Sequence, residues 1–202
     1  MQIENIVFDF GGVLVDWNPR YLFTGEFADP EEMEYFLATV CSPEWNLRQD
    51  AGRSFAEGIA EREQYYPEYT EMIRKYFSDW QIMLRGEISE NVKLLKILQS
   101  TTKLKLFGLT NWSAETMPIA RQRFTFFQCF TGIVVSGEEK MVKPDREIYQ
   151  LLLTRYSLVA ERCLFIDDGE LNVQTAQAMG FHTIHYHGEV RLADEFRRMG
   201  IL

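Results

Sequence analysis

Short apolar runs alternate with helix-like segments along most of the chain, and this alternation constrains the fold more than any other feature. Between the runs lie segments with helical spacing, such as "SENVKLLKILQS" and "PDREIYQLLLTRY". The predicted strands are "NIVFDF" at the N-terminus, "LKLFGLT" near residue 106, "GIVVSG" near 134, "RCLFID" near 165 and "HTIHY" near 184. Such alternation favours a parallel sheet with helices on both faces. Right-handed crossovers then give a doubly wound, Rossmann-like α/β fold.

One region interrupts the alternation. From about Trp17 to Arg85 no convincing strand is found, and "DPEEMEYFLATV", "RSFAEGIAEREQYY" and "PEYTEMIRKYFSDW" show helical spacing with charged faces. Pro30 suits a first helical turn, and Asp29 or Ser54 suits the cap that precedes a helix. We therefore expect an all-helical cap domain at residues 17–86, inserted into an α/β core made of residues 1–16 and 87–202.

Composition and charge narrow the class of partner. The chain has 202 residues, 46% of them hydrophobic, which is ample for a sizeable core. The formal charge of −9 and the lack of a basic run argue against nucleic acid or a membrane surface as the partner. Cys41, Cys129 and Cys163 have no metal-like spacing and indicate a reducing compartment. With no signal peptide or membrane-spanning run in view, we expect a cytoplasmic monomer or homodimer.

Polar side chains follow four of the predicted strands, at the carboxyl end of each strand or in the loop that leaves it. They are, in chain order, Asp9, Thr110, Asn111, Lys143, Asp167 and Asp168. In an open parallel sheet, the loops at the carboxyl ends of the strands build the active crevice. Each residue alone has an ordinary explanation, such as a strand end, a helix cap or a solvated lysine. Together they predict one site where three carboxylates, a hydroxyl and an ammonium converge.

The chemistry of these groups suits a phosphoryl group and a hard cation. Clustered carboxylates repel one another and raise their own pKa values unless a cation joins them. Mg²⁺ takes oxygen ligands and keeps several waters, so few carboxylates suffice. Lys143 supplies positive charge for a phosphoryl oxygen and keeps Asp9 ionised, and the Thr110 hydroxyl suits a further phosphoryl oxygen. An ionised Asp9, placed in line, would act as a covalent nucleophile.

With these segments in place, the sequence resembles the haloacid dehalogenase-like hydrolase superfamily over nearly its whole length. The family's motifs occur in order: a strand-end aspartate in "VFDFGGVL", a strand-end Thr or Ser in "GLTNWS", a lysine before proline in "KPDREIY", and an acidic pair in "DDGELN". The resemblance implies that Asp9, Thr110 and Lys143 are catalytic. It also implies that Thr110, Asn111 and Lys143 bind the phosphate.

The resemblance further implies a Mg²⁺ site formed by Asp9, the backbone carbonyl of Gly11 and Asp168, with Asp167 acting indirectly. Most metal-dependent phosphatases of this superfamily carry an acid where this chain has Gly11. That acid protonates the leaving group and then activates water, and its loss removes about 10²–10⁴-fold in rate. Asp16 lies near enough in sequence to substitute for it, but a helix cap before "NPRYLF" is the better interpretation of Asp16.

The sequence is therefore compatible with three functions. The leading one is a Mg²⁺-dependent phosphatase that hydrolyses a small phosphate monoester, such as a sugar phosphate, through an aspartyl-phosphate on Asp9. The second is a metal-independent 2-haloacid dehalogenase, which the Asp167–Asp168 pair disfavours because carboxylates without a cation repel an anionic substrate. The third is a catalytically weak or non-catalytic binding protein, which Gly11 keeps open.

Substrate choice is expected in the inserted helices, since a cap can close over the site and exclude water. Trp17, Arg20, Trp45 and Arg48 are candidates for a polar and aromatic pocket. Packing is the better interpretation of the tryptophans, and exposure or ion pairing is the better interpretation of the arginines.

Overall fold

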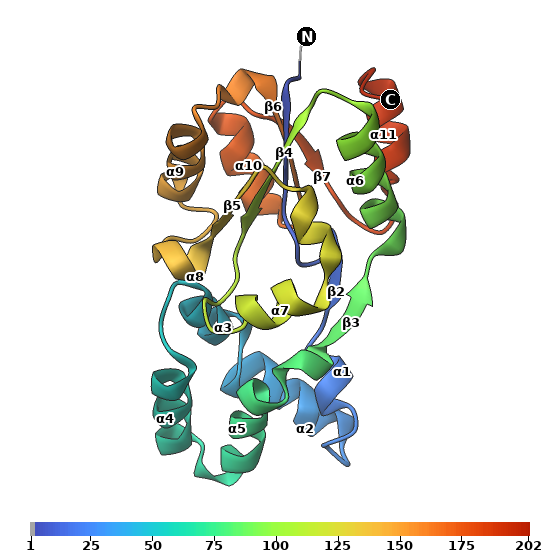
Figure 1. Cartoon of the computed structure of the whole chain (residues 1–202). Helices are drawn as coiled ribbons and strands as arrows, with labels where there is room; N and C mark the ends of the chain where they lie inside the picture. The colour runs from blue at the N-terminus through green and yellow to red at the C-terminus, as the bar shows by residue number, and fades with distance from the viewer. Residues whose placement is uncertain (1–2) are drawn as a thin grey trace.

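The computed structural model describes residues 3–202 and confirms the α/β fold (Figure 1). Its main sheet has five parallel strands, and β1 lies at the centre with β4 and β6 on either side. In spatial order the strands are β5 (Gly132–Val135), β4 (Lys105–Thr110), β1 (Asn5–Phe8), β6 (Cys163–Asp167) and β7 (His182–His185). The predicted strands are thus all present, in the order expected of a doubly wound fold.

Helices cover both faces of this sheet, as the near-continuous apolar strands require. Ile6 and Phe8 on β1 pack into the cluster that includes α6 (Ser89–Thr101) and α11 (Leu192–Arg198), whereas Val7 packs into the cluster with α9 and α10. The remaining core helices are α7 (Met117–Arg123), the 3-10 helix η4 (Thr125–Cys129), α8 (Ser136–Glu139), α9 (Arg146–Tyr156), η5 (Ala160–Arg162) and α10 (Glu170–Ala178).

The segment after the first strand forms a separate group of helices below the sheet in Figure 1. Its elements are α1 (Arg20–Phe23), α2 (Pro30–Tyr35), the π-helix η1 (Phe36–Val40), α3 (Pro43–Asp50), α4 (Phe55–Tyr65), η2 (Pro67–Tyr69), α5 (Thr70–Ser78) and η3 (Trp80–Met83). Two helices begin at the predicted capping residues: Asp29 caps α2, and Ser54 forms a capping box with Glu57 at the start of α4. Buried aromatic rings, among them Trp45 and Tyr76, fill its interior.

A short antiparallel ribbon joins the helical segment to the sheet. It consists of β2 (Val15–Trp17) and β3 (Leu84–Glu87), and the predicted boundaries at 16/17 and 86/87 fall inside it. The expectation of no strand between Trp17 and Arg85 is therefore wrong at both ends. Strands this short, with the sequences "VDW" and "LRGE", lack a readable apolar alternation, and their pairing partners lie about 70 residues apart.

Across residues 3–202, no helix is both long enough and apolar enough to cross a membrane.

Candidate active site

Asp9 lies directly beyond β1, at the carboxyl edge of the central strand. Its backbone N–H donates to Ile166 O at 2.9 Å, which keeps Asp9 in register with β6. The N–H of Phe10 donates to Asp9 Oδ1 at 2.7 Å and orients the carboxylate. Only 7% of the residue is exposed, so Asp9 is a buried acid at the edge where β1, β4 and β6 end together.

Lys143 brings a buried ammonium to this acid. Its Nζ lies 3.0 Å from Asp9 Oδ1 and 2.6 Å from Asp167 Oδ2, and it donates to Leu109 O at 3.0 Å. Only 1% of Lys143 is exposed. A buried charge persists only when it is paired and hydrogen-bonded, and here two carboxylates and a carbonyl oxygen meet that condition.

Asn111 fixes the loop that carries Lys143. Its side-chain Nδ2 donates to Lys143 O at 2.9 Å, and its Oδ1 accepts from Lys143 N at 2.8 Å. The amide therefore fastens the end of β4 to the loop before α9. The sequence predicts a phosphate contact for Asn111. The structure adds the hydrogen bonds that position Lys143, which no local sequence pattern indicates.

Thr110 is fully buried at the end of β4, and its hydroxyl has no hydrogen-bond partner among residues 3–202. An unsatisfied buried hydroxyl costs about 1–3 kcal/mol. Such a group needs an explanation, and a ligand oxygen at the strand edge provides one.

The two residues of the acidic pair, Asp167 and Asp168, have different surroundings. Asp167 is fully buried, and its Oδ1 accepts from Gly169 N and Asn172 Nδ2, both at 2.8 Å, while its Oδ2 faces Lys143. Both of its oxygens are therefore occupied. Asp168 is exposed, and its carboxylate lies over the turn at Gly12. A Cβ at Gly12 would lie 2.1 Å from Asp168 Oδ2, and the φ of +70° there suits glycine.

Carboxylate oxygens of Asp9, Asp167 and Asp168 all lie within 4.8 Å of one another. Three oxygen donors at that spacing match the ligand preference of Mg²⁺. A Cβ built on Gly11 meets no atom within 4 Å, so that side of the turn is uncrowded. The donor set therefore fits the predicted Mg²⁺, with Asp9 and Asp168 better placed to hold it than the fully engaged Asp167.

The electrostatics favour the same conclusion. Burial raises the pKa of Asp9 to about 8, Asp167 and Asp168 act in the same direction, and Lys143 opposes them. Burial and Asp167 also raise the pKa of Asp168. Burial alone would lower the pKa of Lys143, but Asp167 and Asp9 outweigh it and raise that pKa. Three carboxylates thus face one permanent cation, and a second cation would stabilise their ionised forms.

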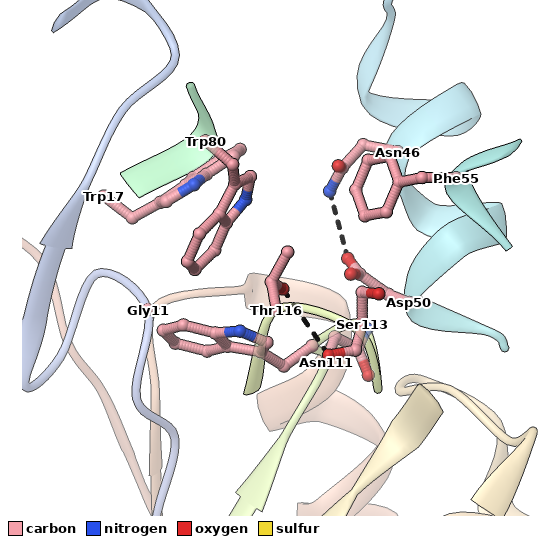
Figure 2. Close-up of a pocket in the computed structure, with 10 residues that line it drawn as sticks. Gly11, Trp17, Asn46, Asp50, Phe55, Trp80, Asn111, Ser113 and Thr116 are labelled. Carbon is pink, nitrogen blue, oxygen red and sulfur yellow. Dashed lines mark hydrogen bonds between the residues drawn. The ribbon is translucent and has the colours of Figure 1, made fainter. Parts of the chain in front are cut away.

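A cavity opens beside this cluster, between the helical segment and the sheet edge (Figure 2). It encloses about 420 Å³ of atom-free space, part of it open to solvent. Its lining combines four aromatic residues with five polar ones and a glycine. The lining residues are Gly11, Trp17, Asn46, Asp50, Phe55, Trp80, Asn111, Trp112, Ser113 and Thr116. The indole N–H of Trp112 is buried and has no hydrogen-bond partner within residues 3–202.

The cap residues that the sequence analysis named as candidates for a pocket have different surroundings in the structure. Trp45 packs in the interior and donates to Gly58 O at 3.2 Å, as expected. Arg20 and Arg48 form ion pairs with acidic residues on the exposed surface. Trp17 packs half-buried against the core, as expected, and it also lines the cavity.

Asp16 does not cap a helix. It lies on β2, and its carboxylate accepts from the hydroxyl of Tyr21 at 2.9 Å and 3.0 Å. The Asn18 side chain serves the start of α1 instead, accepting from Arg20 N at 3.0 Å. Sequence reasoning missed the other lining residues: Asn46, Asp50, Phe55, Trp80, Trp112, Ser113 and Thr116. Asp50 and Trp80 belong to the helical segment and reach the cavity through the way that segment lies against the sheet, which local patterns do not encode.

Comparison with known proteins identifies the family. A model of the haloacid dehalogenase-like hydrolases matches residues 3–180. A sesquiterpene phosphatase, astK of Aspergillus oryzae, is 26% identical over 198 residues, which cover 96% of this chain and 94% of that protein. A phosphorylated carbohydrates phosphatase of Thermotoga maritima is 24% identical over 195 residues, which cover 91% of this chain and 84% of that protein.

Among solved structures, a HAD family enzyme of Bacteroides thetaiotaomicron in complex with magnesium has a similar fold. Its TM-score is 0.77 at 20% identity, and the match covers 98% of this chain and all of that one. The family match spans most of the chain, including the strand that ends at Asp9, the Lys143 loop and the acidic pair. The chain is thus a HAD-like hydrolase, a member of the haloacid dehalogenase-like hydrolase family.

Proposed function

We propose that the protein is a Mg²⁺-dependent phosphatase that hydrolyses a small phosphate monoester through an aspartyl-phosphate on Asp9. The observation that carries this proposal is the placement of Asp9: 3.0 Å from the buried Lys143, within a carboxylate cluster, and next to a strand that ends in an unpartnered hydroxyl. The phosphatase names of two relatives that span nearly the whole chain support it.

The reaction would begin when a carboxylate oxygen of Asp9 attacks phosphorus. The charge of Lys143 lowers the pKa of Asp9 against the effect of burial and attracts a phosphoryl oxygen, and Thr110, whose hydroxyl has no partner among residues 3–202, donates to another. Asn111 maintains the position of Lys143 through its two main-chain bonds. Mg²⁺, held by Asp9, Asp168 and the Gly11 carbonyl, would supply positive charge to the phosphoryl oxygens. Asp167 holds Lys143 and the turn at Gly169 in place.

The cavity indicates the kind of alcohol that leaves. Aromatic rings of Trp17, Phe55, Trp80 and Trp112 suit an apolar or ring-shaped leaving group, which packs on their faces. Polar groups at intervals suit a few hydroxyls. We therefore propose a phosphorylated metabolite of modest size, a sugar or an isoprenoid alcohol. The three cysteines are free thiols in the structure, which supports a cytoplasmic setting.

The acidic pair also weighs against dehalogenation. A metal-independent dehalogenase would bring a carboxylate substrate to a site where three carboxylates already face one ammonium. That arrangement repels the substrate unless a cation is present. We therefore rank a phosphoryl substrate with its metal above a haloacid.

Phosphate release from a panel of sugar, isoprenoid and nucleotide monophosphates tests the proposal, with Mg²⁺ and with EDTA in parallel. We expect release with Mg²⁺ only, and its loss in Asp9→Asn. A beryllofluoride adduct on Asp9 would mark the nucleophile directly. Halide release from 2-chloropropionate that persists in EDTA would contradict the proposal. Inactivity on the whole panel together with no Mg²⁺ binding would instead favour a non-catalytic binding protein.

A further inference from the structure

Gly11 leaves space where a side chain would otherwise stand. A Cβ built on Gly11 meets no atom within 4 Å, and Gly11 lines the cavity beside Asp9. No proton donor can therefore come from position 11 itself. Whatever group serves the leaving oxygen must reach the cavity from another wall.

Asp50 supplies a carboxyl group on another wall of the same cavity. It is the last residue of α3, and its side chain points into the space in Figure 2. Asn46 Nδ2 donates to Asp50 Oδ2 at 3.1 Å, and the backbone of Ser113 lies near the carboxylate and lowers its pKa. Asn46 is itself held by the hydroxyl of Tyr76, which donates to its Oδ1 at 3.3 Å. The carboxyl group is thus partly buried and oriented.

The segment that carries Asp50 is clamped to the sheet edge. Ser136 Oγ donates to Asp50 O at 2.6 Å, and Phe55 N donates to Glu115 Oε2 at 2.6 Å. Between them, Gly52 has a φ of +95°, and a Cβ there would lie 3.1 Å from Gly137 O and 2.9 Å from a side-chain carbon of Lys140. Such close backbone approach fixes Asp50 relative to the nucleophile's side of the cavity.

We propose that Asp50 is the general acid–base of the reaction, supplied by the helical cap in place of an acid at position 11. This role rests on the phosphatase function proposed above. Asp50 is, among the residues that line the cavity, the one with a carboxyl group.

The electrostatic setting suits both halves of that role. Burial raises the pKa of Asp50 to about 7, against the opposing effects of the Ser113 backbone bond and of Lys143. Tyr76, whose own pKa burial raises, stays neutral beside it. An acid whose pKa lies near the working pH can both donate and accept a proton at useful rates.

The two steps balance. In the first, Asp9 forms a bond to phosphorus while the bond from phosphorus to the alcohol oxygen breaks, and the Asp50 proton moves to that oxygen and releases the alcohol. In the second, the Asp50 carboxylate takes a proton from water as the water oxygen bonds to phosphorus. The bond from phosphorus to Asp9 breaks, inorganic phosphate leaves, and Asp50 is protonated again.

The test compares Asp50→Asn with the wild-type protein on two substrates in saturating Mg²⁺. One is an alkyl phosphate, whose alcohol leaves poorly without a proton, and the other is 4-nitrophenyl phosphate, whose phenolate leaves unaided. For the variant we expect alkyl turnover about 10²–10⁴-fold lower with no burst. With the aryl substrate we expect a burst of about one nitrophenol per enzyme and then slow turnover, because the aspartyl-phosphate awaits its base.

Asp16→Asn is the matched control, since it removes the same charge from β2 at a residue that does not line the cavity. It should leave both rates within about twofold of the wild type. Asp50→Glu should restore part of the alkyl turnover, and a cooperative thermal transition for each variant shows that it is folded.

The outcomes separate the two proposals. Wild-type inactivity on both substrates would contradict the phosphatase function and, with it, the role of Asp50. An active wild type with an unchanged Asp50→Asn variant would contradict the role of Asp50 alone. An equal loss of turnover on both substrates, without a burst of nitrophenol, would show that Asp50 has only a structural role and would overturn the proposal.

Discussion

At the scale of single residues, Lys143 is tightly constrained by burial and by its ion pairs. Its ammonium lies between two carboxylates with almost no solvent contact. Removing one partner from a buried ionic set leaves the others uncompensated and costs about 3–5 kcal/mol. We expect Lys143→Ala to lower the free energy of unfolding by about that amount at pH 7, measured in urea, and to abolish phosphate release. Lys103→Ala, at an exposed lysine, should change neither. A loss below about 1 kcal/mol for Lys143→Ala would contradict this prediction.

Burial of Asp50 lowers the free energy of unfolding at neutral and higher pH, and replacing this residue should remove that loss of stability. Its pKa rises from 3.8 to about 7 on folding, so the native protein holds a proton that the unfolded chain gives up between those values. The stability contributed by this residue is therefore full below about pH 4 and lost as pH rises through about 7. We expect Asp50→Asn to have a free energy of unfolding about 1–3 kcal/mol higher than that of the wild type at pH 8, measured in urea, and to lose that advantage at pH 4.5. A difference independent of pH would contradict the raised pKa.

Single residues also show what a sequence reveals about a site. Asp9 and Thr110 were readable because each stands at the end of an apolar run, and Lys143 because it precedes a proline in the loop that leaves the next strand. Parallel strands end at a common edge, which brings the three together. The aspartate at position 50 carries no such signal. It ends a helix, and only the long-range contact between Ser136 and its carbonyl reveals that it faces the sheet.

At the scale of elements, the turn after α3 decides how the cap meets the sheet. Gly52 adopts a left-handed backbone, and a side chain there would press on Gly137 O and on Lys140. We expect Gly52→Ala to lower stability by about 1–3 kcal/mol. We also expect slower turnover of alkyl phosphates, because the turn sets the position of Asp50.

Gly25→Ala is the control for this change. Gly25 lies in a turn of the same helical segment, and a Cβ there meets no atom within 4 Å. Thermal melts and alkyl phosphate turnover should be near wild type for Gly25→Ala and impaired for Gly52→Ala. Equal behaviour of the two variants would show that the turn tolerates a side chain and does not position Asp50.

Elements differ in how far local sequence determines them. Four of the five sheet strands were predictable because each is an apolar run beside a helical pattern, whereas β7, with the sequence "HTIH", is only partly buried and was predictable from the helical pattern that ends at Gly180 before it. The helices α2 and α4 were predictable from their capping residues. The ribbon of β2 and β3 was not, since each strand is stabilised by a partner about 70 residues away and neither has an apolar pattern of its own. Tertiary pairing decides such elements.

At the scale of the whole molecule, an acidic chain gathers three carboxylates at the edge where the sheet meets the cap. The formal charge is −9, and the three clustered carboxylates are balanced within the site by Lys143 alone. Folding must therefore hold this cluster together against its own repulsion. A cation that binds only the folded chain would stabilise the whole molecule, by about 2.7 kcal/mol at 100 times its dissociation constant.

We accordingly expect Mg²⁺ to raise the thermal unfolding midpoint and EDTA to reverse the rise. Because burial raises the pKa of Asp9 to about 8, the ion must displace a proton at neutral pH, and its affinity should increase between pH 6 and pH 8. Calorimetric titration in two buffers of different ionisation enthalpy measures both the affinity and the released proton. Asp168→Asn should weaken binding, whereas Asp194→Asn, on an exposed helix, should not. Binding that does not change with pH would mean that Asp9 is already ionised by Lys143, and that the ammonium alone prepares the nucleophile.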